Sequence, residues 1–345
     1  MVNNKKTNSQ IDKDTILSSM SEGILAVDNN MCILMVNQTG IDYLDIKSKK
    51  PVGEKIHKII KDKKFLEFAN DLLEQKQPIK EEIRIKKNTV RYFIANGTVI
   101  ESGKSGILIV ISDITKIKQL EKIRQDFVAN VSHELKTPIT SIVGFLETLK
   151  KSNIPKEKQK EFLKKALKNS NRLNAIIDDL LWLSKIESME DTETFDLSNH
   201  TLLDIINGSI SDVQNQADKN DNIIKVECKP FIRIKADEQL LREAFINLLE
   251  NAIKYGESSK RIKITVFIDK KIFIIFHNYG GHIPKKYSER IFQRFYRIDK
   301  SRSRRQGGTG LGLAIVKHII FVHGGEIYVE SKKKKGTQFT ICLPQ

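Results

Sequence analysis

The stretch FVANVSHELKTPIT, residues 127–140, decides the architecture because it combines a helical repeat with an internal proline. At about 100° per residue, one apolar stripe about 80° wide contains Phe127, Val131, Leu135, Pro138, Ile142, Phe145 and Leu149. His133 falls at about 240°, so it points away from the stripe, and Thr137 lies one turn further on the same face. Glu134 lies between that face and the stripe. Because Pro138 cannot donate a hydrogen bond to the carbonyl of Glu134, we predict a bend one turn past His133.

The helical repeat continues on both sides of this stretch. Ile117 and Leu120 precede it at coiled-coil spacing, and a second long helix is predicted after Pro155. One face of that second helix carries Phe162, Ala166, Leu173, Ile177, Leu180 and Ser184. Two helices with one apolar stripe each bury little surface alone. We therefore predict a homodimer in which two hairpins form a four-helix bundle.

The segments that flank the helices have mixed α/β patterns. In the first we expect a hairpin from strands 24–27 and 33–36, helical segments within 51–75, and strands 80–86, 90–95 and 106–112. In the second we expect helices 199–218, 237–255 and 311–323 with strands 223–228, 261–268, 271–277, 326–331 and 338–343. At about 150 residues per domain, 345 residues suit two or three domains. The fold class predicted is multidomain α+β, divided into residues 12–116, 117–190 and 195–345.

Composition narrows the class of partner. Apolar residues make up 39% of the chain, which permits a packed core and excludes wholesale disorder. The net charge of +16 suits an anionic partner, but the lysines are scattered and fit a solvated surface better. A DNA-binding protein ranks last among the functions considered, because no predicted helix carries a basic stripe.

The cysteines and the hydropathy pattern bear on location. Cys32, Cys228 and Cys342 lie far apart and are odd in number, so neither a disulfide framework nor a CxxC metal site is predicted. No apolar run approaches the roughly 18 residues of a membrane span, and the N-terminus lacks the apolar stretch of a signal peptide. We expect a soluble protein of the reducing cytoplasm.

His133 is a candidate nucleophile. A neutral imidazole can attack with one nitrogen while a neighbouring carboxylate, here Glu134, holds the proton on the other. On geometry alone, a solvated surface histidine without a function is the alternative. The remaining histidines lack the i,i+4 spacing of helical metal ligands, so no metal-ligand cluster is predicted; they are His57, His200, His277, His282, His318 and His323.

The predicted helix 237–255 has a polar face opposite its apolar side. Glu243, Asn247, Asn251 and Lys254 follow one another at spacings of four, four and three. An amide oxygen binds a hard cation and a lysine binds phosphate, so this row can face a nucleotide, with Tyr255 packing on the base. The alternative is an ordinary solvated helix face.

The sequence GGTGLGLA, residues 307–314, opens the next helix. Its glycines let backbone N–H groups approach a phosphate at the helix N-terminus, although the GK[ST] of a Walker A loop is missing. Basic side chains crowd the segment just upstream and either clamp phosphates or keep the loop solvated; they are Arg294, Arg297, Lys300, Arg302, Arg304 and Arg305.

Taken in order, these motifs resemble those of the sensor histidine kinases of two-component systems. FVANVSHELKTPIT resembles the phosphoacceptor box, NLLENAIKY (247–255) the N box, and NYGGHIP (278–284) the first glycine box. IFQRFYRIDKSRSR (291–304) resembles the F box with the start of the ATP lid, and GGTGLGLA the second glycine box. The resemblance is strong from residue 114 onward. Residues 12–116 resemble a PAS sensor domain more loosely, through SEGILAVDNN and DITK.

The resemblance implies both a fold and an activity. The implied fold is a PAS-like α/β sensor (12–116), a coiled coil with a dimeric phosphoacceptor hairpin (117–190), and the two-layer α/β ATP-binding sandwich of gyrase and Hsp90 (195–345), the GHKL-type ATPase or Bergerat fold. The implied activity is a homodimeric histidine kinase that phosphorylates itself from ATP and passes the group to an aspartate of a response regulator. Phosphatase activity toward that partner is implied as well, and no nucleic acid or membrane span is expected.

The resemblance also implies residue roles. His133 would accept the phosphoryl group, Glu134 would orient and deprotonate its ring, and Thr137 would position water for dephosphorylation. Asn251 would bind Mg²⁺. The nucleotide would be held by Asn247, Asn251, Lys254, Tyr255, Asn278, Gly280, Arg297, Gly308, Gly310, Leu311 and Gly312. Related ATP-hydrolysing proteins carry a glutamate base where Asn247 stands, and an amide cannot act as a base, which fits transfer to histidine.

Two departures from the family pattern affect the first glycine box. Asn278 replaces the aspartate that accepts a hydrogen bond from the adenine amino group, which weakens that bond by about 1 kcal/mol. His282 replaces a glycine, which puts the local backbone path in question, and Gly281 can compensate. These departures motivate the alternative of a nucleotide-binding-impaired pseudokinase that serves as a dimeric scaffold.

Overall fold

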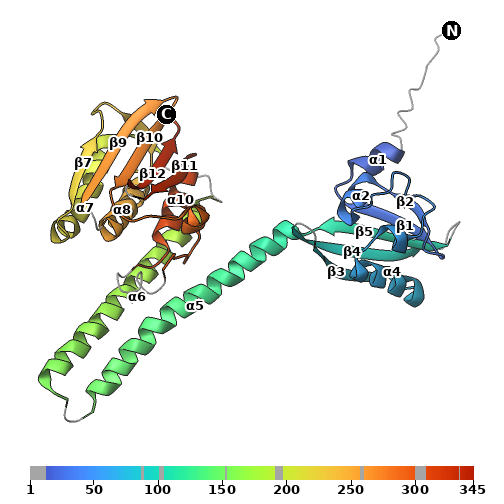
Figure 1. Ribbon diagram of the computed structural model, residues 1–345, viewed down its shortest axis with the longest axis horizontal. Coiled ribbons are helices and arrows are strands. Elements are labelled where there is room, and N and C mark those ends of the chain that lie inside the picture. The colour runs from blue at the N-terminus through green and yellow to red at the C-terminus, as the bar shows by residue number, and fades with distance from the viewer. Residues whose placement is uncertain are drawn as a thin grey trace, which may run out of the picture. The chain divides into compact units, whose positions relative to one another are not determined.

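The computed structural model describes residues 13–86, 89–100, 105–151, 154–190, 197–256, 260–299, 308–333 and 335–345. The chain divides into two compact units, Met1–Asp126 and Phe127–Gln345. The boundary falls inside a single long helix, α5, which spans Thr115–Leu149 (Figure 1). Within the described ranges, no helix combines the length and the apolar character needed to cross a membrane.

The first unit contains an antiparallel sheet with the order β2-β1-β5-β4-β3. Its strands are β1 (Gly23–Asp28), β2 (Ile33–Val36), β3 (Ile79–Lys86), β4 (Val90–Ile100) and β5 (Gly106–Asp113). Its helices are α1 (Lys13–Ser19), α2 (Gln38–Leu44), α3 (Ile56–Ile59) and α4 (Lys63–Gln75). The predicted hairpin is confirmed. Its turn is held by the carboxylate of Asp28, which accepts hydrogen bonds from the backbone N–H groups of Asn30 and Cys32 at 2.9 and 2.8 Å.

Helix α4 covers one face of this sheet. The carboxylate of Asp62 caps the helix by accepting from the backbone N–H of Phe65 at 3.0 Å. The apolar side of α4 then buries Phe65, Phe68 and Leu72 against strand residues of the same core. Gly97 of β4 permits this close packing, because a Cβ there would lie 2.3 Å from Leu72 Cδ2.

The second unit begins with a helical hairpin. Beyond residue 127, α5 runs antiparallel to α6 (Lys156–Glu190), as predicted (Figure 1). Phe145 and Phe162 stack between the two helices with ring centroids 5.8 Å apart. The predicted stripe of α5 is buried or half-buried throughout, whereas His133 is exposed. The helix continues through Pro138, and the predicted bend stays a prediction.

The predicted apolar face of α6 is wrong in its C-terminal half. Ile177 is 41% exposed and Ser184 is exposed, while Ile176, Leu183 and Ile186 are fully buried. The reason is that α10 (Gly312–Val322) packs against α6 and moves the buried face round the helix.

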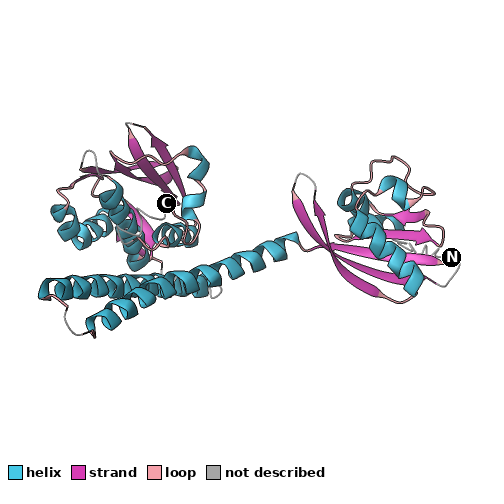
Figure 2. Ribbon diagram, turned by 60° about the horizontal axis from the view of Figure 1, so that its bottom comes forward, coloured by secondary structure: helices cyan, strands magenta, loops and turns pink. Residues whose placement is uncertain are grey.

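The rest of the second unit is a two-layer α/β domain. Its sheet has the order β11-β12-β10-β9-β7, antiparallel except for the parallel pair β7 and β9. The strands are β7 (Ile223–Glu227), β9 (Arg261–Asp269), β10 (Lys271–Asn278), β11 (Glu326–Lys332) and β12 (Gly336–Leu343). Helices α7 (Leu202–Lys219), α8 (Glu238–Tyr255) and α10 form the other layer (Figure 2). Alternate strand residues such as Ile264, Ile274 and Ile341 are buried beneath them.

One small sheet was not predicted. Strands β6 (Ser198–Thr201) and β8 (Arg233–Ala236) pair antiparallel, so the helix expected from residue 199 begins three residues later, at Leu202. Pairing in register with β8 holds these residues extended. The backbone N–H of Leu202 then donates to the carbonyl of Ile232 at 2.9 Å.

Candidate functional site

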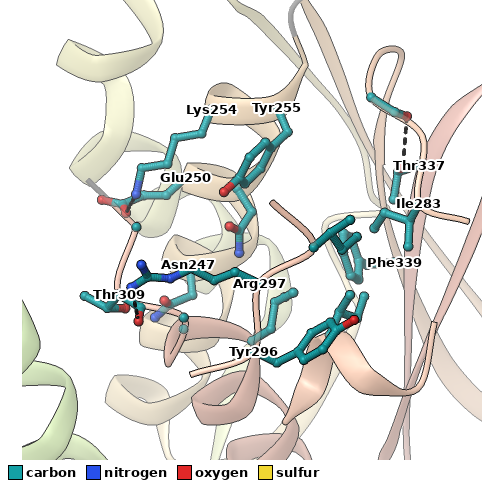
Figure 3. Close-up of a pocket in the computed structure, with 18 of the residues that line it drawn as sticks. Asn247, Glu250, Lys254, Tyr255, Ile283, Tyr296, Arg297, Thr309, Thr337 and Phe339 are labelled. Carbon is teal, nitrogen blue, oxygen red and sulfur yellow. Dashed lines mark hydrogen bonds and ion pairs between the residues drawn. The ribbon is translucent and has the colours of Figure 1, made fainter. Parts of the chain in front are cut away.

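A cavity of about 420 Å³ is lined by α8, by α6, by the loop after β10 and by the segment that leads into α10. The polar face of α8 supplies Asn247, Asn251, Lys254 and Tyr255 (Figure 3). Asn278 lies at the end of β10 and is only 4% exposed. Gly308, Gly310 and Gly312 come from the glycine-rich segment that leads into α10, and Arg297 from the preceding loop. The structure thus gathers nine of the predicted nucleotide contacts into one cavity within the described residues.

Two predicted contacts lie elsewhere. Leu311 is fully buried in the core and is the residue from which α10 starts, so only its backbone is near the cavity. Gly280 does not line the cavity either. Some predicted basic residues lie outside the described residues; they are Lys300, Arg302, Arg304 and Arg305.

The amide of Asn247 has a fixed orientation. Its Nδ2 donates to the carbonyl oxygen of Glu243 at 3.0 Å and to Glu243 Oε1 at 2.9 Å. Its Oδ1 therefore points the other way, toward Gly312, where a Cβ would lie only 2.3 Å from that oxygen. Glycine at 312 lets α10 begin directly against the polar face of α8.

Lys254 is held in place within α8. Its Nζ lies 2.9 Å from Glu250 Oε2, and Gln216 of α7 donates to Glu250 Oε1 at 3.1 Å. Both side chains of the Lys254–Glu250 pair are 30% exposed, so the ammonium faces the cavity while its charge is partly compensated.

The loop after Asn278 is built from hydroxyl contacts. Ser331 accepts from the backbone N–H of Ile283 at 2.9 Å and lies 2.8 Å from the hydroxyl of Thr337, which donates to the carbonyl of Gly281 at 3.2 Å (Figure 3). The left-handed φ of +39° falls on Gly281, where a Cβ would lie 2.8 Å from the carbonyl oxygen of Tyr255. The imidazole of His282 turns to Ser331, with Nδ1 3.3 Å from Oγ. Gly281 therefore adopts the left-handed backbone conformation of this loop, and His282 does not need to.

The turn of α5 that carries His133 meets this cavity through its neighbour. Glu134 Oε2 lies 2.7 Å from an Nη of Arg172 on α6 and 3.3 Å from an Nη of Arg297. The three side chains are only 13%, 12% and 6% exposed. Arg297 also donates to the carbonyl of Thr309 (Figure 3). The carboxylate beside His133 thus joins α5, α6 and the loop at the cavity's edge.

A second contact parallels the first. Arg294 pairs with Glu187 of α6, and its guanidinium lies 5.1 Å from the ring centre of Phe127. Phe127 also contacts Phe295, with centroids 6.0 Å apart. The segment 294–297 is therefore docked on the helical hairpin by charge and by aromatic packing.

Among the predicted catalytic residues, His133 is exposed and Thr137 is half-buried. The hydroxyl of Thr137 donates to the carbonyl of His133 at 3.0 Å, which leaves its lone pairs available as acceptors. No group of three or more His, Cys, Asp or Glu side chains arranged to hold a metal ion occurs in the part of the chain described.

The sequence did not predict one acidic residue of the site, Asp179, or the role of another, Glu243. Asp179 of α6 lines the cavity, and burial raises its pKa to about 6 although a hydrogen bond from Thr309 opposes the shift. Burial and then the charge of Asp179 raise the pKa of Glu243. Glu243 belongs to the predicted polar row, but its role as partner of Asn247 was not foreseen. Asp179 gave no signal, because only tertiary packing brings α6 to the cavity.

Three family models match successive parts of this chain. Residues 11–114 match the PAS fold, residues 123–188 the His Kinase A (phospho-acceptor) domain, and residues 236–345 the Histidine kinase-, DNA gyrase B-, and HSP90-like ATPase family. The phosphate regulon sensor protein PhoR of Pseudomonas aeruginosa is 31% identical over 332 residues, covering 94% of this chain and 72% of PhoR.

Two further comparisons agree. The sensor histidine kinase WalK of Bacillus subtilis is 29% identical over 96% of this chain, which spans 54% of WalK. A crystal structure of the histidine kinase ThkA in complex with the response regulator protein TrrA superposes with a TM-score of 0.53 at 24% identity, covering 96% of this chain and 97% of ThkA. The likeness to ThkA shows a shared fold.

Proposed function

Because the chain belongs to the sensor histidine kinases of two-component systems, we propose that it phosphorylates its own His133 from ATP and passes the phosphoryl group to an aspartate of a response regulator. The predicted fold class is confirmed by its PAS, phosphoacceptor and ATPase regions. The observation that carries the activity is the contact of Arg297, at the edge of the cavity, with Glu134 beside His133. The domain limits 12–116, 117–190 and 195–345 and the cytoplasmic location are part of the proposal.

The cavity suits an adenine nucleotide at both ends. The base would lie at Asn278, whose amide can accept from an exocyclic amino group, among Ile283, Ile291 and Phe339. The phosphates would point toward Lys254 and the backbone N–H groups at the start of α10, where the helix dipole favours an anion. The ordered path of the loop at Gly281 supports nucleotide binding over the pseudokinase alternative.

The residues present fit Mg²⁺. The Oδ1 of Asn247 is turned away from Glu243, and Asn251 follows one turn later on the same face, so amide oxygens are available as hard ligands. When bound, Mg²⁺ would neutralise charge on the triphosphate. Asn251 is the proposed ligand, with Asn247 beside it.

The proposed first step forms a nitrogen–phosphorus bond. A neutral ring nitrogen of His133 attacks the terminal phosphorus, the bond to the bridging oxygen breaks, and ADP leaves with the electron pair. Glu134 takes the proton from the other ring nitrogen. Since Arg172 and Arg297 hold Glu134 in the described arrangement, transfer follows release of Arg297 from that carboxylate.

The proposed second step consumes the phosphohistidine. An aspartate oxygen of the response regulator attacks the phosphorus, the nitrogen–phosphorus bond breaks, and the ring recovers its proton. The exposure of His133 on the outer face of α5 leaves room for such a partner. In a separate reaction, the hydroxyl of Thr137 would orient a water that attacks the phosphorus of the phosphoaspartate. The bond from phosphorus to the aspartate oxygen would break, releasing inorganic phosphate and the carboxylate, which is the phosphatase activity.

The helical hairpin supports the homodimer. A second apolar stripe lies beside the buried one, and its members are 46% to 64% exposed; they are Val128, Ile139, Val143 and Leu146 of α5 and Leu163, Leu167 and Leu181 of α6. Large apolar side chains in a continuous exposed stripe indicate an interface. We propose that the same stripe of a second copy covers it and completes a four-helix bundle.

The proposal is tested by incubating the full chain with ATP labelled in the terminal phosphate and Mg²⁺. We expect label that is labile in acid and stable in base, which is typical of a phosphoramidate. His133→Gln should remove it, whereas Thr137→Ala should keep it and lose dephosphorylation of the partner. Failure of the wild-type dimer to take up label while binding ATP would refute the kinase, and failure to bind ATP at all would favour the scaffold.

A further inference from the structure

The nucleotide cavity is lined in part by the phosphoacceptor hairpin. Ala175 and Asp179, one turn apart on α6, lie on its wall together with residues of α8. One and two turns further along α6, Leu183 and Ile186 are fully buried in the core of the C-terminal domain. The carboxylate of Asp179 is therefore held at the cavity by a packed helix.

Asp179 lies at the phosphate end of the cavity. It shares the cavity wall with Thr309, Lys254 and Glu250. Burial and the charge of Glu250 raise the pKa of its carboxyl, whereas the hydroxyl of Thr309 and the ammonium of Lys254 lower it. Thr309 precedes the glycines at the start of α10, and Lys254 is the ammonium proposed to meet phosphate. A hydroxyl donor and an ammonium around a buried anion form the setting that a phosphate group requires.

A terminal phosphate would compete with this carboxylate. The triphosphate carries more negative charge and reaches one phosphate further than the diphosphate. A second negative charge close to the half-buried carboxylate of Asp179 is unfavourable. ATP would therefore displace Asp179 and with it α6, whereas ADP would leave both in place.

We propose that Asp179 is a specificity-determining residue that discriminates nucleoside triphosphate from diphosphate by competing with the terminal phosphate for Thr309 and Lys254. The inference rests on the nucleotide site of the proposed function and adds a coupling between ATP binding and the docking of α6. By linkage, a docked α6 weakens ATP binding by the same factor by which ATP weakens docking. ADP formed by transfer to His133 would then allow α6 to return.

The chain offers a matched control for the test. Asp178 is the exposed neighbour of Asp179 on the same helix, so Asp178→Asn makes the same change of charge outside the cavity. Dissociation constants for ATP and ADP with Mg²⁺ are measured by calorimetry on the full chain. We expect Asp179→Asn to tighten ATP binding about tenfold and ADP binding less than twofold. Asp178→Asn should leave both constants unchanged.

Two outcomes overturn the inference. Equal tightening of ATP and ADP by Asp179→Asn means that the carboxylate repels any nucleotide and does not sense the terminal phosphate. Unchanged constants mean that it does not compete at all. Asp179→Ser repeats the test without an amide if Asn does not fold. Absence of binding of either nucleotide by the wild type instead refutes the nucleotide site itself, so the two failures are distinguishable.

Discussion

The cavity around α8 and the turn of α5 around His133 differ in how far the fold prepares them. In the cavity, the amide of Asn247 is oriented by Glu243 and the loop at Gly281 is fixed by Ser331 and Thr337. At the turn, His133 is exposed and Glu134 is held by arginines from other segments. The first region is preorganised and the second is restrained. In the proposed function, nucleotide would bind in the preorganised cavity, and release of Glu134 from its arginines would regulate access to the acceptor.

The largest expected effect comes from filling the close approach of α8 and α10. Gly312→Val places a Cβ about 2.3 Å from Asn247 Oδ1, so either the Asn247 amide must leave its hydrogen bonds to Glu243 or the two helices must separate. Overpacking of this kind costs about 3 kcal/mol, which weakens ATP binding more than a hundredfold. Calorimetric titration of the full chain measures it.

Gly144→Val is the control for this substitution. Nothing lies within 4 Å of a Cβ at Gly144, which sits in α5, so ATP binding should stay within twofold of wild type. If both valine variants lose ATP equally, the cavity is not preorganised by the contact at Gly312.

The next largest effect is on stability, and it concerns the ion pair that holds Glu134 beside His133. Arg172→Ala leaves Glu134 with one fewer cation in a site where both side chains are about one-eighth exposed. We expect the free energy of unfolding to fall by about 2 kcal/mol, measured by urea denaturation at fixed protein concentration. Lys165→Ala, which removes an exposed pair with Glu161 on the same helix, should change it by less than about 0.5 kcal/mol. Equal losses would show that burial does not strengthen the restraint.

A smaller effect on ATP binding is expected from substitution of Glu243, which orients the amide of Asn247. Glu243→Ala removes the side-chain acceptor of Asn247 Nδ2 and leaves only the backbone carbonyl of residue 243, and we expect about tenfold weaker binding of ATP with Mg²⁺. Glu243→Gln still accepts from Asn247 Nδ2, so it should stay within twofold. The two variants separate the effect of the hydrogen bond from the effect of the charge. If Glu243→Gln loses as much ATP affinity as Glu243→Ala, the negative charge matters and the hydrogen bond does not.

The smallest expected effect is on the pH dependence of stability, and it concerns the buried His323. Burial lowers the pKa of His323, whose Nε2 accepts from the backbone N–H of Asp237 at 3.1 Å, so the folded state holds it neutral. Its contribution to stability is complete above the unfolded pKa of about 6.5 and is lost as the pH falls below that value. The stability advantage of wild type over His323→Gln should shrink by about 1 kcal/mol between pH 7.5 and 5.5. A stability advantage that stays constant over this pH range would contradict a neutral, buried His323.

The sequence predicted best what local periodicity encodes. The polar row of α8 and the exposed side of α5 follow from helical spacing, and the glycines at the start of α10 from their freedom near an anion. Sheet β6–β8 was missed because four polar residues, Ser198–Thr201, show no strand alternation. The buried face of α6 was misplaced, and Arg172 and Asp179 were not foreseen, because these depend on which segments pack together. No spacing along the chain reports a contact between residues 134 and 297.

In the proposed function, ATP bound in the preorganised cavity phosphorylates His133 on the restrained turn. The most direct measurement is mass spectrometry, at neutral or alkaline pH, of the peptide containing residues 127–140 after the full chain has reacted with ATP and Mg²⁺. We expect one added phosphoryl group on His133 in the wild type and in Gly144→Val, and none in Gly312→Val. A phosphoryl group on a different residue, or equal labelling of Gly312→Val and wild type, would contradict it.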